Sequence, residues 1–205
     1  MNTVSNAFPV GIIVRNLLGW GIKYVSCGML TIVLLLCFAA LVFVQVAVWG
    51  SDVSWLAPLF RFLPADMQQG GTHELHAGDI SAFLMHLWMG LSLVLTALAA
   101  VWRLTKRVRS GAPLVGAPAS IADGLSLKPA SQHVRIHAKR RFLIGLGLVS
   151  AIFACAFAAI PHARMAAGSS HADMVGVFVA FYVFALVLTA AYVGIGIVAD
   201  KILDG

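Results

Sequence analysis

The sequence predicts an all-α, polytopic membrane protein: a four-transmembrane-helix bundle with an N-terminal interfacial helix. Its composition is one reason, because 60% of the residues are apolar and only 11% are charged, whereas soluble domains carry roughly 25% charged residues. The mean hydropathy is +0.93. The pattern is the other reason, because four apolar runs each approach the ~20 residues that cross a hydrocarbon core about 30 Å thick. The 205 residues therefore suit a single membrane domain.

The segment that precedes the first long apolar run is apolar but too short to span a bilayer. Residues 8–21 read FPVGIIVRNLLGWG and are interrupted by Gly11, Arg15 and Asn16. We predict a helix in the membrane interface, with Trp20 and Tyr24 at the depth of the headgroups. The alternative is that these residues begin one tilted helix that continues into the first span.

Four spans follow from the apolar runs, at residues 24–49, 80–102, 142–160 and 174–198. The first is longer than the apolar core of a signal peptide and lacks a cleavage site, so we expect it to be retained. The third is the shortest and ends at Pro161, because proline cannot continue a helix.

Basic residues concentrate in one segment between the second and third spans. Nine of the 14 lysines and arginines lie in residues 103–141, which we predict to be a cytoplasmic loop. We expect residues 132–141 to extend the third helix beyond the bilayer. Twelve basic residues would share the cytoplasmic side against two, Arg61 and Arg164, on the other. The sequence thus predicts a multi-pass protein of the bacterial inner membrane with both termini in the cytoplasm. The loop should attract anionic lipid headgroups rather than nucleic acid.

Four histidines fall in the exterior loops and form the candidate metal site: His73, His76, His162 and His171. Imidazole is a good ligand for zinc and copper. However, His73 and His76 lie in HELH, which lacks the HExxH order of metalloproteases. We therefore expect a polar loop without a cofactor, and keep zinc or copper binding as the alternative.

Polar residues inside the spans are few, and three are candidates for contacts within the membrane. His86 lies in the second span with Asp79 seven residues before it, and Gln45 lies near the outer end of the first span. Ionisable groups at membrane depth are costly and so point to function. We expect His86 to bond within the bundle or to a partner subunit, with a proton relay as the alternative, and Gln45 to bond between helices.

Small residues recur every four positions in the last two spans, where they let helices approach closely. The third span carries Gly147, Ala151, Cys155 and Ala159, and the fourth carries Gly176 and Ala180, then Ala190 and Gly194. We expect these stripes to pack within the bundle, with contact to another protein as the alternative. The three cysteines, Cys27, Cys37 and Cys155, should be small buried thiols at helix contacts and form no disulfide.

The second half of the chain resembles small inner-membrane proteins encoded with the type IV secretion genes of integrating conjugative elements. The similar features are a span that ends in basic residues, a Gly-rich loop and the sequence HAKRR at residues 137–141 entering the third span. Ala159-Ile160-Pro161, a short turn with histidine and a last span that closes near Lys201 complete the resemblance, which covers about 120 residues. It implies a role in an envelope-spanning conjugation machine and assigns no catalytic residue.

Motifs of common enzyme classes are missing from the sequence. It holds no GxSxG, P-loop or dinucleotide fingerprint, and no carboxylate pair within a span. We therefore expect a non-enzymatic subunit that works with other membrane protein subunits, in a secretion or conjugation apparatus. The alternatives are a membrane redox or metal-handling protein that uses the exterior histidines, and a small membrane enzyme.

Overall fold

The computed structural model describes residues 10–50, 77–109, 128–165 and 167–204. All regular structure in these ranges is helical. In chain order the elements are α1 (Val10–Trp49), α4 (Ala77–Arg109), α5 (Lys128–Ala159), the short 3₁₀ helix η3 (Ile160–His162) and α6 (His171–Asp204). Within these ranges, four helices are long and apolar enough to cross a membrane, which confirms the predicted all-α class and the four candidate spans.

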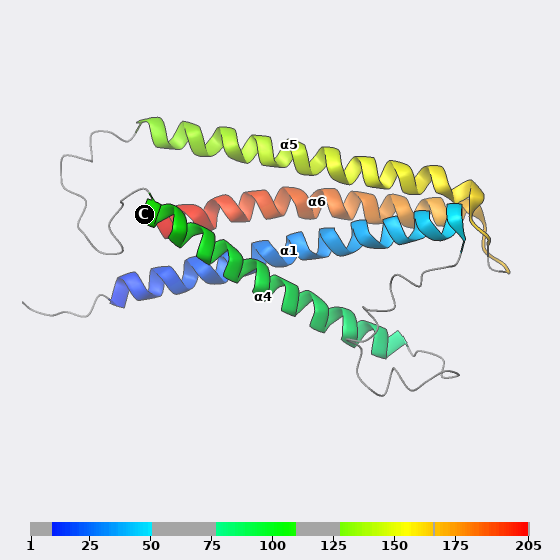
Figure 1. The fold of residues 1–205 in the computed structure, drawn as a ribbon, viewed down its shortest axis with the longest axis horizontal. Helices are drawn as coiled ribbons and strands as arrows, with labels where there is room; N and C mark the ends of the chain where they lie inside the picture. The colour runs from blue at the N-terminus through cyan, green and yellow to red at the C-terminus, as the bar shows by residue number, and fades with distance from the viewer. Residues whose placement is uncertain (1–9, 51–76, 110–127, 166, 205) are drawn as a thin grey trace, which may run out of the picture.

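The four long helices alternate in direction (Figure 1). α1, α5 and α6 lie side by side, whereas α4 packs along α1 and runs diagonally to it, so that its first turns diverge from the other helices. The end of the bundle where α4 and α6 finish and α5 begins is called the basic end below. The core lies between α1, α5 and α6 and contains Val33, Cys37, Ala40, Val149, Phe153, Ala156, Ala185 and Leu188.

Phe153 is central to this core, because only 1% of its surface is exposed. Its ring lies 5.5 Å from the ring of Tyr182 and 6.4 Å from that of Phe178, centroid to centroid. The Tyr182 hydroxyl lies 2.9 Å from the Ser150 hydroxyl. Aromatic packing and one polar contact therefore join α5 to α6 in the middle of the bundle.

α1 corrects the predicted boundary between an interfacial helix and the first span. It is one continuous helix of 40 residues that begins at Val10, so residues 10–21 are not a separate element. The alternative, a single helix that continues into the span, describes the structure. At 1.5 Å per residue α1 is about 60 Å long, roughly twice the thickness of the hydrocarbon core.

The helices next to the predicted basic loop are longer than the apolar runs. α4 continues to Arg109, and α5 begins at Lys128, which confirms that the third helix extends beyond its apolar part. Both ends of the predicted 103–141 loop are therefore helical. At the other end α5 stops at Ala159, as expected before Pro161, and the chain forms η3 with proline in its first turn.

α6 begins at a reciprocal cap formed by Ser170 and Asp173. The Ser170 hydroxyl accepts a bond from the Asp173 backbone N–H at 3.2 Å. The Asp173 carboxylate accepts one from the Ser170 N–H at 3.0 Å and one from the Ser170 hydroxyl at 2.7 Å. A serine followed three residues later by an acidic residue satisfies donors that the first turn would otherwise leave unpaired, which explains where α6 starts.

Candidate functional site

A row of polar contacts, termed the polar seam, joins the middle of α4 to α1. Gly28 has no side chain, so the Trp88 indole lies against the α1 backbone and donates from Nε1 to the Gly28 carbonyl at 3.0 Å. One turn further, the Ser92 hydroxyl lies 3.3 Å from the Thr31 hydroxyl, which itself donates to the Cys27 carbonyl at 2.9 Å. Ser92 and Thr31 are fully buried. In lipid such contacts hold helices together, because apolar side chains gain little by exchanging lipid for protein.

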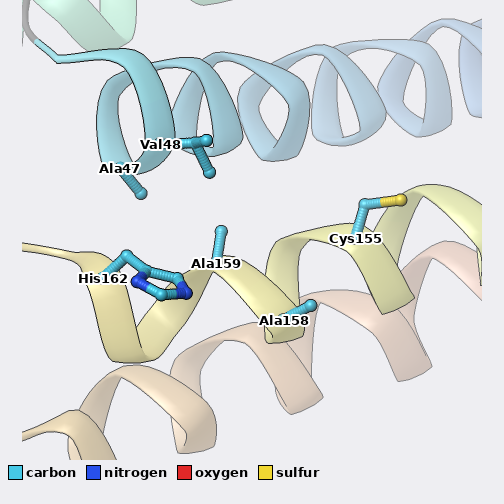
Figure 2. Close-up of a pocket in the computed structure, with 6 residues that line it drawn as sticks. All are labelled: Ala47, Val48, Cys155, Ala158, Ala159 and His162. Carbon is cyan, nitrogen blue, oxygen red and sulfur yellow. The ribbon is translucent and has the colours of Figure 1, made fainter.

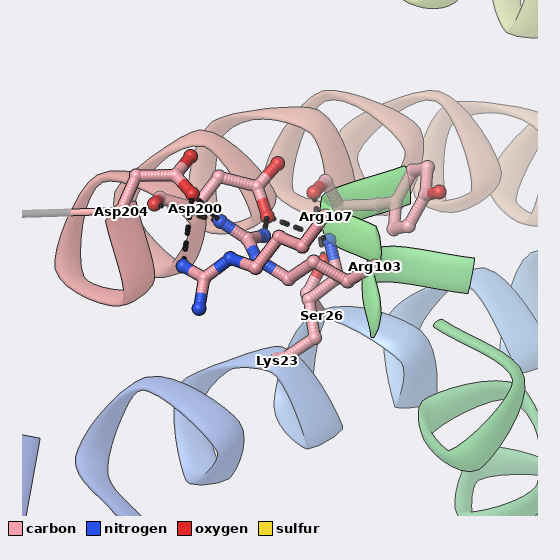
Figure 3. Close-up of polar contacts among 7 residues, drawn as sticks. Lys23, Ser26, Arg103, Arg107, Asp200 and Asp204 are labelled. Carbon is pink, nitrogen blue, oxygen red and sulfur yellow. Dashed lines mark hydrogen bonds and ion pairs between the residues drawn. The ribbon is translucent and has the colours of Figure 1, made fainter. Parts of the chain in front are cut away.

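The seam leads to a cluster of charged residues at the basic end, shown in Figure 3. Asp200 of α6 pairs with Arg103 of α4 at 2.7 Å and with Lys23 of α1 at 3.4 Å. Asp204, one turn later, pairs with Arg103 and lies 3.6 Å from Arg107. The cluster therefore ties three helices together at one level. The Arg103 side chain is only 18% exposed, so this pair is shielded more than an ordinary surface salt bridge.

The two arginines also contact the backbone at the end of α6. Arg103 Nη2 donates to the Asp200 carbonyl at 3.3 Å, and Arg107 Nη2 donates to the Leu203 carbonyl at 3.0 Å. The last carbonyls of a helix lack partners within the helix and form its negative end. α4 thus supplies cations that cap α6 and offset two carboxylates at its unfavourable end.

This cluster was missed by the sequence interpretation, although the sequence holds a signal for it. Arg103 and Arg107 are four residues apart at the end of one helix, and Asp200 and Asp204 have the same spacing at the end of another. Residues four apart share a helix face, and both helices end on the same side. Matching spacings of opposite charge therefore indicate a pair of complementary faces.

A groove lies at the opposite end of the bundle, between the last turns of α1 and of α5 (Figure 2). It has a volume of about 550 Å³ and is open to the surroundings. Its lining comprises Ala47, Val48, Cys155, Ala158, Ala159 and His162. The small alanines leave the space unfilled, and His162 is its most polar member.

Of the three predicted intramembrane residues, His86 and Gln45 are described with their side chains, on α4 and α1. His86 is exposed and lies on the face of α4 turned away from Trp88 and Ser92, which contact α1. Asp79, seven residues earlier, falls on the same face by helical register, and its side chain lies outside the described residues. Gln45 is half-buried near the end of α1. Their proposed polar contacts stay predictions.

Of the four candidate metal ligands, His73 and His76 lie outside the described residues. His162 and His171 are described, and both are exposed, one in η3 and the other in the first turn of α6. The part of the chain that the structure describes contains no group of three or more histidine, cysteine, aspartate or glutamate side chains that could hold a metal ion. Zinc or copper binding stays a prediction, to be tested by the metal content of protein purified without chelators.

The residues of the predicted small-residue stripes lie mostly on exposed faces of α5 and α6. On α5, Gly147, Ala151 and Cys155 are exposed, and only Ala159 is buried. On α6, the predicted small positions are likewise exposed, namely Gly176, Ala180, Ala190 and Gly194. A Cβ added at Gly147 or Gly176 would meet nothing within 4 Å. Apart from Ala159, these residues are thus exposed in the described part of the chain, and their packing, within the bundle or against another protein, stays a prediction.

Other small residues form the close helix contacts instead. Ser26 donates to the Tyr192 carbonyl at 2.9 Å, and a Cβ at Gly196 would lie 3.3 Å from the Ser26 hydroxyl. A Cβ at Gly145 would lie 3.1 Å from the Thr189 methyl carbon. The cysteines divide in a similar way: all three are free, with Cys27 and Cys37 buried as expected, whereas Cys155 is exposed.

Comparisons with known proteins give no match to this chain, either among protein-family models or among curated proteins and solved structures.

Proposed function

We propose that this chain is a non-enzymatic subunit of a larger membrane-protein assembly in the bacterial inner membrane. Its resemblance to small membrane proteins of integrating conjugative elements makes a conjugation or type IV secretion apparatus the assembly to test first. The chain contributes helices that pack against other subunits and carries out no chemical step of its own in this proposal.

One observation carries the proposal: a face of α5 made of small residues is exposed in the part of the chain that the structure describes. Gly147, Ala151 and Cys155 are exposed, and so are Ala154 and Ala158, which share this face by helical register. Helix association in lipid depends on close packing and interhelical hydrogen bonds, and small residues allow the closest approach. A face of this kind therefore suits another transmembrane helix better than it suits lipid alone.

The proposed orientation rests on the distribution of charge. The basic end carries most of the lysines and arginines, so it would face the cytoplasm together with both termini. In a cysteine-free background, an impermeant thiol reagent should label Gly70→Cys and Ala167→Cys from outside intact cells, but not Pro118→Cys. Labelling of position 118 from outside would overturn this orientation.

The subunit proposal is tested by the size of the complex extracted in mild detergent. Gly147→Leu and Ala151→Leu should each release the chain from a larger complex on native gels, because the added side chain separates the helices. His86→Leu should do the same if the imidazole is shared with a partner. Ala97→Leu is the matched control, since it enlarges another exposed alanine, on α4. A chain that migrates alone in the wild type and in every variant would contradict the proposal.

A further inference from the structure

The charged cluster marks a position on α1 from which distances along the helix, and so across the membrane, can be measured. Lys23 contacts Asp200, and Asp200 contacts Arg103, so three helices reach this level together. From Lys23 to Trp49 α1 rises about 39 Å at 1.5 Å per residue. That length already matches the roughly 40–45 Å of a bilayer with its headgroups. Residues 10–22 of α1 therefore continue about 20 Å beyond the charged level. In Figure 1 the blue end of α1 reaches past the end of α6.

This projecting part of α1 has an apolar stripe on one side, termed the α1 stripe. Its members recur at the i, i+3, i+4, i+7 and i+8 positions of a helix, and each is between 46% and 69% exposed: Val10, Ile13, Val14, Leu17 and Leu18. The opposite side faces the bundle, where Gly19 is buried against Leu203 of α6. The stripe is thus separate from the contacts that fix α1 to α6.

The surroundings of the α1 stripe are charged rather than apolar. α5 also projects at this end, but its extension carries the exposed residues His137, Lys139 and Arg140, as suits a helix in water. By contrast, Arg15 is the only charged residue of α1 before Lys23. The extension of α5 has the sequence KPASQHVRIHAKRR, which contains no comparable run of five large apolar residues. An exposed apolar surface such as the α1 stripe usually marks an interaction site.

We propose that the α1 stripe docks into an apolar groove with an acidic rim on a partner protein, at the membrane surface next to the basic end. This inference rests on the subunit function proposed above and names a second contact for the subunit. The spacing is that of helices recognised by a groove through anchors on one face. Arg15 flanks the stripe, and residues 10–49 contain no acidic side chain, so an acidic rim gives charge complementarity.

Two other occupants fit the structure less well. A helix that lies along the membrane surface can bury such a stripe in lipid, but residues 10–22 continue the spanning helix without a break and cannot turn into the membrane plane. A second copy would bring together two surfaces rich in exposed cations, which repel each other. Those cations include Lys106, Arg109, Lys139, Arg140 and Lys201.

The lipid alternative is tested with the full chain alone, in vesicles of phosphatidylethanolamine and phosphatidylglycerol. An environment-sensitive fluorophore is attached at Val14→Cys, with the three native cysteines replaced by alanine. Docking to a protein groove predicts that aqueous iodide quenches the fluorophore and that nitroxide-labelled acyl chains do not. Quenching by the labelled acyl chains instead would overturn the proposal, because lipid would then cover the stripe.

The protein partner is tested in native membranes with a benzophenone amino acid at position 14 or 17, and at position 12 on the opposite side as control. The stripe positions should cross-link to one protein species, and an adduct of two copies of this chain would overturn the proposal. Leu17→Glu should lower the amount of that same partner in the purified complex at least about tenfold, because the variant loses a buried anchor. Asn16→Asp, which places a negative charge outside the stripe, should retain it.

The two proposals can fail separately. If Leu17→Glu leaves the complex intact while Gly147→Leu dissociates it, the chain is a subunit but the α1 stripe is not its docking surface. If no complex is found for the wild type, both proposals fail together. The solubility and elution of Leu17→Glu in detergent show whether the variant is folded, and loss of the partner from a folded variant is the expected result.

Discussion

Arg103 of α4 donates to the carboxylate of Asp200 of α6 across 2.7 Å, although the two residues are 97 positions apart. The same guanidinium reaches Asp204 and the Asp200 carbonyl. One side chain therefore pairs with two carboxylates and caps the end of α6. Because α4 diverges from the other helices at its opposite end (Figure 1), this contact has a large part in holding α4 to the bundle.

Replacing Arg103 by alanine should destabilise the fold. The change leaves Asp200 with Lys23 alone and removes a donor to the end of α6. Losing one partner of a partly buried, hydrogen-bonded ion pair costs about 1–3 kcal/mol. Unfolding in detergent, followed by tryptophan fluorescence as denaturant is added, measures this loss.

The pairing itself is tested by a double-mutant cycle with Asp200→Asn. If Arg103 acts through Asp200, the double variant should be less destabilised than the sum of the single variants. Arg109→Ala, at the exposed end of the same helix, should change stability by less than about 0.5 kcal/mol. Strict additivity of Arg103→Ala and Asp200→Asn would contradict a direct interaction.

Two glycines in the same part of α1 should respond oppositely to alanine. A Cβ at Gly19 would lie 2.6 Å from Leu203 Cδ2 and 2.7 Å from its Cγ, whereas a Cβ at Gly21 would meet nothing within 4 Å. Gly19→Ala should therefore destabilise by about 1–3 kcal/mol through overpacking. Gly21→Ala should stabilise by about 0.5–1 kcal/mol, because alanine restricts the unfolded chain and favours helix. The same denaturant titration measures both, and equal effects would contradict the close approach of α1 and α6.

The number of helices was predictable because apolar runs of membrane length leave few other structures open to the backbone. The residues at which the helices begin and end were less predictable. α1 extends to Val10 through Gly11, Arg15 and Asn16, which suggested an interruption. A helix tolerates single residues of this kind when the rest of the helix packs against its neighbours, as α1 does where the Leu203 side chain lies against Gly19. The length of the apolar runs was therefore enough to predict the spans, but not the residue at which the first helix begins.

The main feature that the sequence could not predict was which helix faces point into the bundle and which point outward. Periodicity placed Gly147, Ala151 and Cys155 on one face but did not say which helix, if any, that face meets. The structure turns it outward and uses Ala156 and Ala185, both fully buried, between the helices instead. Small residues occur on several faces of α5, so spacing alone could not choose between them. The charged cluster was more predictable, since Arg103 and Asp200 lie on helices that end on the same side.

Removing the cap of α6 should loosen its first turn. Ser170→Ala deletes the hydroxyl that accepts from the Asp173 N–H and donates to its carboxylate. Loss of a serine N-cap costs about 0.5–2 kcal/mol. Amide hydrogen exchange should accelerate over residues 171–174 and stay unchanged in the middle of α6. Ser170→Thr keeps the hydroxyl and should exchange like the wild type. If exchange accelerates equally in both variants, the acceleration does not come from loss of the cap hydroxyl.

Thiol labelling distinguishes the three cysteines and reports on the α5 face. Cys27 and Cys37 are buried, whereas Cys155 is exposed beside the groove at the end of α1. A small membrane-permeant maleimide should therefore modify the folded chain in detergent at Cys155, and Cys155→Ala should abolish fast labelling. Rapid modification of Cys37 would contradict its place in the core. If a partner helix covers the α5 face, Cys155 should be labelled more slowly in native membranes than in the purified chain. Gly147→Leu should then restore the faster rate in membranes, since it separates that partner without altering the exposure of Cys155 in the chain itself.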